Sequence, residues 1–290
     1  MNKKVSALFQ KLPLSKGNSF LINRYQSPFF ETPWHFHEEY ELVYCEKGFG
    51  KKFIGNSFSD YQEGEMAFIG KNVPHLFKAD DSFYNSISEI KPSSIVLQFS
   101  DTFIGNGFFQ SAEMTEMKKI LEFSKNGIVI TGETKQKIKA ILYDMLKTDS
   151  ISKLKNLIEI FGLLSTSHDL KPLSIDTIRG INVNDSSKMN MVLEYALEHY
   201  KDEITIKEMA DLVHISVSAF CRYFKSRTQK SFHSFIIEMR LMESVQLLKS
   251  TDMPVLNICY DSGFNNLSNF NRLFKRHFGQ SPTKFRRSFE

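Results

Sequence analysis

The residues FCRYFK at positions 220–225 return as FNRLFK at positions 270–275, so the chain contains two copies of the pattern F-x-R-x-F-K. The segment upstream of each copy is repeated too. Apolar residues in both segments have the i, i+3, i+4, i+7 spacing of a helix that packs one face. We therefore expect each copy to be a short helix followed by a longer one. The spaced residues are Ile206, Met209, Ala210 and Val213 in the first copy, matched by Val255, Ile258, Cys259 and Ser262 in the second.

The ends of these helices also have local signals. Thr205 and Glu208 have the spacing of a capping box, in which each side chain bonds the backbone N–H of the other residue. In the second copy Gly263 suits a left-handed turn residue. Asn265 and Asn266 can both cap the helix that follows, and we expect Asn265 to do so. Each copy is thus predicted to be a helix-turn-helix.

A further helical pattern joins the two copies. Apolar residues recur on one side of a helix from about residue 232 to about residue 249. At ~1.5 Å per residue this helix spans roughly 25 Å. Two recognition helices enter successive major grooves when they lie about one DNA turn apart, near 34 Å. A stiff helix can hold such a separation and a flexible tether cannot, so the pattern favours binding to one face of double-stranded DNA.

The longer helix of each copy carries basic and amide side chains beside its phenylalanines. Arginine can bond guanine through two N–H groups, asparagine can pair with adenine, and lysine mostly neutralises phosphate. For the two arginines of the repeated pattern, a salt bridge or a phosphate contact is the alternative to base reading. For Lys225, Lys275 and Arg276, phosphate contact or plain solvation is favoured. The candidate DNA-binding residues are Ser218, Arg222, Lys225, Asn266, Ser268, Asn269, Asn271, Arg272, Lys275 and Arg276.

Charge is distributed unevenly along the chain. Residues 214–290 contain 12 Lys and Arg against 5 Asp and Glu, a net charge of +7, while the rest of the chain has a net charge of −3. A basic carboxy-terminal segment beside an acidic remainder is expected when one domain meets a polyanion. A solvated basic face without a partner is the alternative.

Length and composition restrict the class of protein. The 290 residues are 41% hydrophobic and 24% charged, which is typical of a globular protein of about two domains. No apolar run approaches the roughly 20 residues of a membrane helix, and the amino terminus lacks the features of a signal peptide. The three cysteines are an odd number without a CxxC pair, which indicates neither a disulfide scaffold nor a zinc finger. We therefore expect a cytoplasmic protein with no membrane partner.

The amino-terminal region has a different sequence pattern from the helical carboxy-terminal region. Short β-like runs separated by Gly, Asn, Pro and Asp occupy about residues 18–100 and predict a sandwich or barrel. Helical periodicity follows from about residue 111 to residue 168, interrupted by a short extended link at residues 127–132. The apolar stripes of these helices can pack on the barrel, mediate dimerisation, or do both in part.

Four potential ligands lie in the β-rich region. His35, His37, Glu41 and Gly48 fit the pattern HxHx3Ex6G, the first motif of cupin barrels, and the stretch 64–75 resembles the second. Two histidines at i and i+2 on a strand point to the same face of the sheet. A barrel interior can therefore gather four side chains around one effector or one ion. These candidate effector-pocket and metal residues are His35, His37, Glu41 and His75.

This cluster admits more than one function. Three imidazoles and a carboxylate suit a divalent metal such as Zn, Fe, Mn, Ni or Cu. Hydrogen bonding to an effector, or a structural role in the barrel wall, is the alternative. The second motif departs from the cupin pattern, with Gly70 in place of its proline and Ala79 in place of its final asparagine. The sequence therefore requires no cofactor and leaves a divalent metal as an option.

Catalysis has little support. The sequence shows no Ser-His-Asp order, no phosphate-binding glycine loop and no HExxH. We therefore expect that the protein is not an enzyme.

Several spaced residues agree with one known family over the last hundred positions. They are Ala210-x11-Arg222-x-Phe224-Lys225, Gly263-Phe264, the pattern at 270–275, and the ending Phe278-Gly279-x-Ser281-Pro282-x-x-Phe285-Arg286. In these motifs the region from 190 to 288 resembles the DNA-binding domain of the AraC/XylS family of transcription regulators. The resemblance implies DNA binding through both helix-turn-helix units, with Arg222 and Arg272 as the recognition-helix arginines. It also implies a cupin-like sensor domain and helices that dimerise.

The predicted fold class is therefore α+β with two domains, an N-terminal cupin-like β-barrel followed by helices and a C-terminal all-α domain with two helix-turn-helix motifs. The expected boundaries are 1–105 for the barrel, 106–170 for a helical dimerisation or relay segment, 171–187 for a linker and 188–290 for the DNA-binding domain. We expect a regulator that binds promoter DNA, senses a small-molecule effector, forms a homodimer and contacts RNA polymerase. The alternatives are a metal-dependent cupin enzyme, or a module that responds to a protein partner, tethered to DNA.

Overall fold

The chain separates into two compact units, residues 1–187 and residues 188–290. The structure, a computed structural model, describes residues 19–26, 32–83, 91–173, 186–228 and 230–287. Most of the expected linker, at 174–185, lies outside the described residues. No helix in the described part of the chain has both the length and the apolar character needed to cross a membrane.

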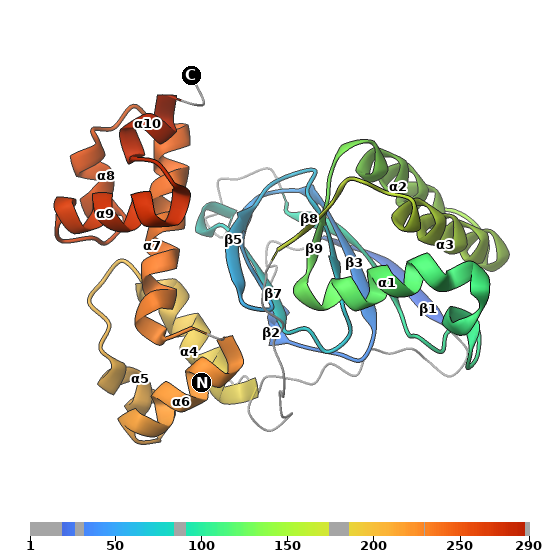
Figure 1. Ribbon diagram of the computed structural model, residues 1–290, viewed down its shortest axis with the longest axis horizontal. Coiled ribbons are helices and arrows are strands. Elements are labelled where there is room, and N and C mark those ends of the chain that lie inside the picture. The colour runs from blue at the N-terminus through green and yellow to red at the C-terminus, as the bar shows by residue number, and fades with distance from the viewer. Residues whose placement is uncertain (1–18, 27–31, 84–90, 174–185, 229, 288–290) are drawn as a thin grey trace. The chain divides into compact units, whose positions relative to one another are not determined.

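Unit 1 is built on two β-sheets (Figure 1). One has six strands in the order β1-β8-β3-β6-β9-β10, and the other has four in the order β2-β7-β4-β5. Neighbouring strands are antiparallel in both sheets. The strands are β1 (Phe20–Gln26), β2 (Thr32–His35), β3 (Tyr40–Lys47), β4 (Gly50–Ile54), β5 (Ser57–Tyr61), β6 (Met66–Ile69), β7 (His75–Ala79), β8 (Ser93–Phe99), β9 (Ile128–Ile130) and β10 (Leu170–Pro172).

The two sheets pack face to face. Alternate residues of a strand point to opposite sides, so Val43 of β3 and Ala67 of β6 face inward. There they form one apolar cluster with Ile54 of β4 in the four-stranded sheet. The enclosed space between the sheets is the interior of the barrel, and the cupin-like antiparallel domain expected from the sequence is confirmed.

Three helices cover the outer face of the six-stranded sheet (Figure 1). They are α1 (Thr115–Phe123), α2 (Gly132–Met145) and α3 (Ser150–Ser165). Phe99 of β8 and Phe161 of α3 are both buried, and their ring centroids lie 5.0 Å apart. Leu42 of β3 and Leu142 of α2 belong to the same core cluster. The apolar stripes expected on these helices thus pack against the sheet, while Ile151 and Ile158 stay exposed on α3.

Two short strands extend this sheet beyond what the sequence indicates. The sequence predicts a link at residues 127–132 and a linker from residue 171. In the structure β9 pairs with β6 and β10 pairs with β9, so both segments belong to the six-stranded sheet. A three-residue strand is too short to show an alternating pattern, and its partners are distant along the chain. The sensor unit therefore includes its helical segment and continues to at least residue 172.

Unit 2 is all-helical, as expected. The pairs α5–α6 and α8–α9 form the two helix-turn-helix motifs, and α7 joins them (Figure 1). At ~1.5 Å per residue, the 19 residues of α7 span roughly 28 Å. The helices are α4 (Ser186–His199), α5 (Ile206–Leu212), α6 (Val217–Thr228), α7 (Phe232–Ser250), α8 (Val255–Asp261), α9 (Leu267–Phe278) and α10 (Pro282–Arg287).

Helix α7 contributes to both motifs. Near its start, the Phe235 ring lies 5.5 Å from that of Phe224 on α6. From its middle to its end, Leu241 and Leu248 share a core cluster with Phe270 of α9. A single continuous helix whose two ends are embedded in different cores holds the two recognition helices as one body.

The helix ends follow the sequence signals in part. The capping box is present, with the Glu208 N–H donating to Thr205 Oγ1 at 3.2 Å and the Thr205 N–H donating to Glu208 Oε2 at 2.7 Å. The expectation that Asn265 caps α9 is wrong. Asn266 is the cap, and its Oδ1 accepts from the Asn269 N–H at 2.8 Å. Asn266 directly precedes the first residue of α9, and only from there can a short side chain reach the third backbone N–H of the helix.

Candidate functional site

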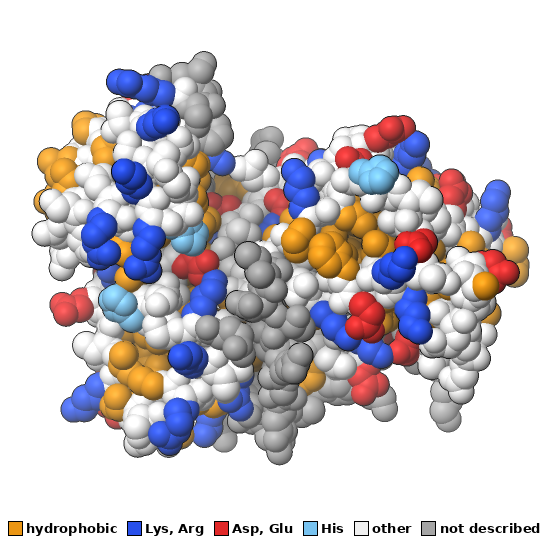
Figure 2. Space-filling model, viewed as in Figure 1, with side chains coloured by type: hydrophobic (Ala, Val, Ile, Leu, Met, Phe, Trp, Pro, Cys, Tyr) orange, Lys and Arg blue, Asp and Glu red, His pale blue; other side chains and the backbone are white. Residues whose placement is uncertain are grey.

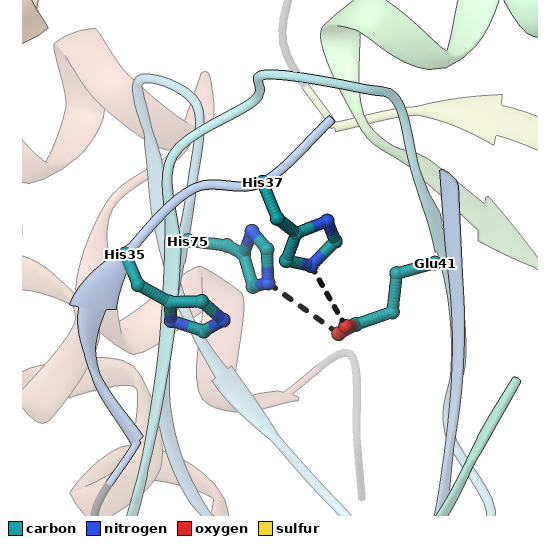
Figure 3. A group of neighbouring side chains, drawn as sticks. All are labelled: His35, His37, Glu41 and His75. Atoms are coloured by element: carbon teal, nitrogen blue, oxygen red, sulfur yellow. Dashed lines mark hydrogen bonds and ion pairs between the residues drawn. The ribbon is translucent and has the colours of Figure 1, made fainter. Parts of the chain in front are cut away.

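Four buried side chains converge at one end of the barrel interior (Figure 3). His35 ends β2, His37 lies in the loop that follows, Glu41 is on β3 and His75 begins β7. Each is at most 5% exposed, and one ligand atom from each lies within 4.8 Å of the others. The register of β2 and β7 places His35 directly opposite His75. All four candidates for the effector or metal site are therefore brought together.

The Glu41 carboxylate is the centre of this group. Its Oε2 lies 3.0 Å from His37 Nε2, and its Oε1 lies 3.4 Å from His75 Nε2 (Figure 3). The Gln98 side chain donates from Nε2 to Glu41 Oε2 at 2.5 Å. The carboxylate is thus oriented by a neutral donor and faces two imidazole rings.

Backbone carbonyls determine which ring nitrogen of two histidines carries the proton. His37 Nδ1 lies 3.1 Å from the Glu39 carbonyl oxygen, and His75 Nδ1 lies 2.8 Å from the Val73 carbonyl oxygen. A carbonyl oxygen only accepts, so each Nδ1 must be the N–H donor. In the neutral rings the Nε2 lone pairs then point at Glu41, which also only accepts when it is ionised.

The pKa values of His37 and Glu41 are shifted because hydrogen-bond acceptors face one another in this group. Burial disfavours the charged form of His37, but the hydrogen bond and the negative charge of Glu41 outweigh burial and raise the pKa of His37. Burial likewise disfavours the Glu41 carboxylate. The electrostatic interaction with His75 and the hydrogen bond with His37 outweigh burial and hold the pKa of Glu41 well below its usual range. The group is therefore built around a buried negative charge that a proton or another cation must balance.

Two polar residues of the barrel interior, Gln98 and Lys52, were not identified in the sequence analysis. Gln98 is 4% exposed on β8, and the signal available was an inward polar residue within an apolar strand. Lys52 of β4 is 3% exposed, pairs with Glu65, and has its pKa lowered by burial to about 8. Alternation along β4 puts Lys52 on the same face as Ile54, which is opposite His75 in the register. The interior therefore has a cationic side chain in addition to the histidine group.

The DNA-binding candidates of the first motif lie on one face of α6. Ser218, Arg222 and Lys225 are all exposed, and their spacing of four and three residues aligns them along the helix. The turn before this helix has a feature that sequence did not indicate, because His214 adopts a left-handed conformation with φ 55°. Asparagine, aspartate and histidine tolerate this region better than other residues with a side chain.

The candidates of the second motif are on α9. The Arg272 guanidinium donates from Nη2 to Asn269 Oδ1 at 2.8 Å, which orients it along the exposed face. Asn271 is half-buried, and the exposed Asn266 is engaged as the helix cap. Figure 2 shows Lys and Arg distributed over the visible face of unit 2 with few acidic side chains among them. The exposed candidates are Ser268, Asn269, Arg272, Lys275 and Arg276.

These two sites match two family models. Residues 17–116 match an AraC-like ligand binding domain, and residues 209–288 match a helix-turn-helix domain. Among curated relatives, the HTH-type transcriptional activator RhaS of Mannheimia succiniciproducens is 23% identical over 256 residues, covering 88% of this chain and 89% of the relative. The Msm operon regulatory protein of Streptococcus mutans is 22% identical over 260 residues, covering 87% of this chain and 86% of the relative.

Solved structures that resemble this chain cover either one unit or most of its length. The DNA-binding domain of AdpA, solved in complex with a target DNA, is 26% identical and covers 34% of this chain and 88% of that one, with a TM-score of 0.33. ToxT from Vibrio cholerae, bound to an unsaturated fatty acid, is 17% identical and covers 92% of this chain and 95% of that one, with a TM-score of 0.36.

Fold, site and family models together define a class. This chain is a DNA-binding transcription regulator with an effector-sensing domain at its amino end and a helix-turn-helix domain at its carboxy end. It belongs to the AraC family.

Proposed function

We propose that α6 and α9 enter successive major grooves on one face of promoter DNA, and that a ligand held by His35, His37, Glu41 and His75 controls this binding. The observation that carries the DNA half of the proposal is the pair of exposed basic helices joined by the continuous α7. Such a rigid pair matches the spacing of grooves along one side of a duplex.

The side chains of the two arginines support base reading. Arg222 and Arg272 are exposed, and within the described residues neither forms an ion pair with a carboxylate. Their guanidinium groups are thus available for DNA. We assign Arg222 and Arg272 to guanine edges, and Lys225, Lys275 and Arg276 to phosphates.

The regulatory half of the proposal concerns the barrel. A ligand shifts an equilibrium between two states only as far as it binds them with different affinity. We propose that ligand binding changes how the two DNA-binding units of a homodimer are presented to promoter DNA and RNA polymerase. The exposed Ile151 and Ile158 on α3 support a dimer formed by the sensor unit. Because the proposed partner is promoter DNA, we propose that the protein acts in the cytoplasm.

The DNA assignment is tested on sequences selected by the full-length protein from random duplexes. We expect Arg222→Ala and Arg272→Ala each to weaken specific binding by about 1–3 kcal/mol. Arg222→Lys keeps the positive charge but loses the bidentate hydrogen-bond donor of the guanidinium group. This variant should therefore retain non-specific DNA binding and lose discrimination at one base. Lys155→Ala, an exposed charge removed from α3, is the control. Unchanged specific affinity in both alanine variants would refute the assignment.

The proposal gives the barrel a binding role and no catalytic one. The test is to incubate the purified protein with compounds that bind it and to look for products. Recovery of each compound unchanged is expected. Turnover that stops in His37→Ala would favour a metal-dependent enzyme tethered to DNA instead.

A further inference from the structure

We propose that His35, His37, Glu41 and His75 bind one divalent transition-metal ion, and that this ion is a ligand to which the regulator responds. The second half of this inference rests on the proposed function, whereas the first concerns the barrel alone. Three imidazoles and one carboxylate favour Zn²⁺, Fe²⁺, Mn²⁺, Ni²⁺ or Cu²⁺. Ca²⁺ and Mg²⁺ prefer oxygen ligands throughout and do not fit this donor set.

Two of the separations already suit a small ion, and the four ligand atoms together lie within 4.8 Å of one another. Bonds of about 2.0–2.1 Å from zinc to nitrogen put neighbouring ligand atoms of a tetrahedral site roughly 3.3 Å apart. The separations from Glu41 to His37 Nε2 and to His75 Nε2 are 3.0 and 3.4 Å. The His35 ring centroid lies 4.2 Å from that of His75, so the third imidazole adjoins the same space.

The groups behind the ligands are those that a metal site requires. A histidine that binds a metal commonly donates its other ring N–H to a carbonyl or carboxylate, which orients the ring and frees the lone pair for the ion. His37 does so to Glu39 and His75 to Val73, both through Nδ1. Glu41 is oriented as an acceptor, because the Gln98 side chain donates to its Oε2. These contacts orient the imidazoles of His37 and His75 and the carboxylate of Glu41 toward one point.

The polar atoms at that point need a cation. His75 Nε2 is buried without a hydrogen-bond partner, and it faces the ionised Glu41. A buried polar atom that lacks a partner costs free energy, and a buried carboxylate facing lone pairs costs more. A metal ion among the four side chains would satisfy the carboxylate and the lone pairs at once.

An ion at this position would contact both sheets of unit 1 and so be coupled to the helices packed on them. Glu41 belongs to the six-stranded sheet, whereas His35 and His75 belong to the four-stranded sheet, so the ion would join the two sheets. Tyr40 and Leu42, on either side of Glu41, point outward into the core shared with α2 and α3. Binding of a metal ion would therefore affect the six-stranded sheet on which these helices pack.

Metal binding is tested on the untagged full-length protein after dialysis against a chelator. The protein is titrated with Zn²⁺, with Co²⁺ and, as the control ion, with Ca²⁺. Elemental analysis gives the number of ions per chain. Trp34, the single tryptophan, is buried next to His35, so its fluorescence reports on the site. We expect one Zn²⁺ or Co²⁺ per chain, a change in Trp34 emission, a higher thermal midpoint of the barrel and no response to Ca²⁺.

Variants identify the ligands and the supporting group. Glu41→Gln preserves the shape of the side chain and removes its charge, and it should abolish stoichiometric binding, as should His75→Ala. Gln98→Ala should keep one site per chain but weaken its affinity by about 10–100-fold. His168→Ala removes an exposed histidine and should change nothing. Circular dichroism checks that each variant folds.

The outcomes separate this inference from the proposed function. Folded wild-type protein that takes up no Zn²⁺ or Co²⁺, or takes it up equally in Glu41→Gln and His75→Ala, would overturn the metal site. DNA binding in the same samples is measured independently, and specific binding can survive that result. Metal that binds at the site but leaves affinity for selected DNA unchanged would overturn the regulatory half of the inference.

Discussion

The turn of the second helix-turn-helix depends on Gly263, and its replacement by alanine gives a quantitative test. Gly263 has φ 87°, in the left-handed region. A side chain there costs roughly 1–2 kcal/mol. A Cβ at this position would also lie 2.7 Å from both the Cα and the carbonyl oxygen of Lys201, which are backbone atoms. Overpacking of this kind adds about 1–3 kcal/mol. We expect Gly263→Ala to lower the free energy of unfolding of unit 2 by about 2–5 kcal/mol.

A second glycine isolates the steric part of this cost. Gly279, at the end of α9, has φ 75°, and a Cβ there would meet no atom within 4 Å. Gly279→Ala should therefore cost only the roughly 1–2 kcal/mol of the left-handed conformation. The difference between the two variants measures the collision with Lys201.

The assay is thermal unfolding of the full-length protein. Circular dichroism follows the helices of both units, because α1, α2 and α3 belong to unit 1. Fluorescence of Trp34 follows unit 1 alone, so the helical signal lost outside the Trp34 transition belongs to unit 2. In a domain of about 60–100 residues each kcal/mol lowers the midpoint by about 4–8 °C. We expect Gly263→Ala to move the helical transition further than Gly279→Ala does, with the Trp34 transition unmoved. Equal shifts in both variants would refute the steric argument.

Three further predictions concern the sensor core, the first DNA-binding motif and the DNA contacts. Phe161→Ala empties a buried site beside Phe99 and should destabilise unit 1 by about 3–5 kcal/mol in urea unfolding followed by Trp34 fluorescence; a loss under 1 kcal/mol would mean that α3 does not pack on the sheet. Thr205→Ala removes the cap of α5 and should cost about 0.5–2 kcal/mol by calorimetry, whereas a neutral change would show that the capping box contributes nothing. Lys275→Ala should reduce the slope of log affinity against log salt by about one unit and leave base preference intact; an altered base preference would make Lys275 a base reader.

Some features of the fold and the site could not be predicted from the sequence. Asn265 and Asn266 have the same side chain, and only the start of α9 at Leu267 shows which one caps the helix. Gln98 is an unremarkable polar residue until the antiparallel pairing of β3 with β8 places it opposite Glu41. Strands β9 and β10 are three residues each, and they exist as strands through partners far away along the chain.

Features that depend on local interactions could be predicted from the amino-acid sequence. They are the repeated helix-turn-helix, the capping box at Thr205, the helical pattern of α7 and the HxHx3E motif. Each involves residues close together along the chain, because capping and amphipathic periodicity act between neighbouring residues. The pairing of β3 with β8 places Gln98 opposite Glu41, and the packing of the two sheets brings His75 to the same carboxylate, and both are visible only in the tertiary structure. Strand pairing and burial depend on contacts between distant segments, and no local pattern specifies them.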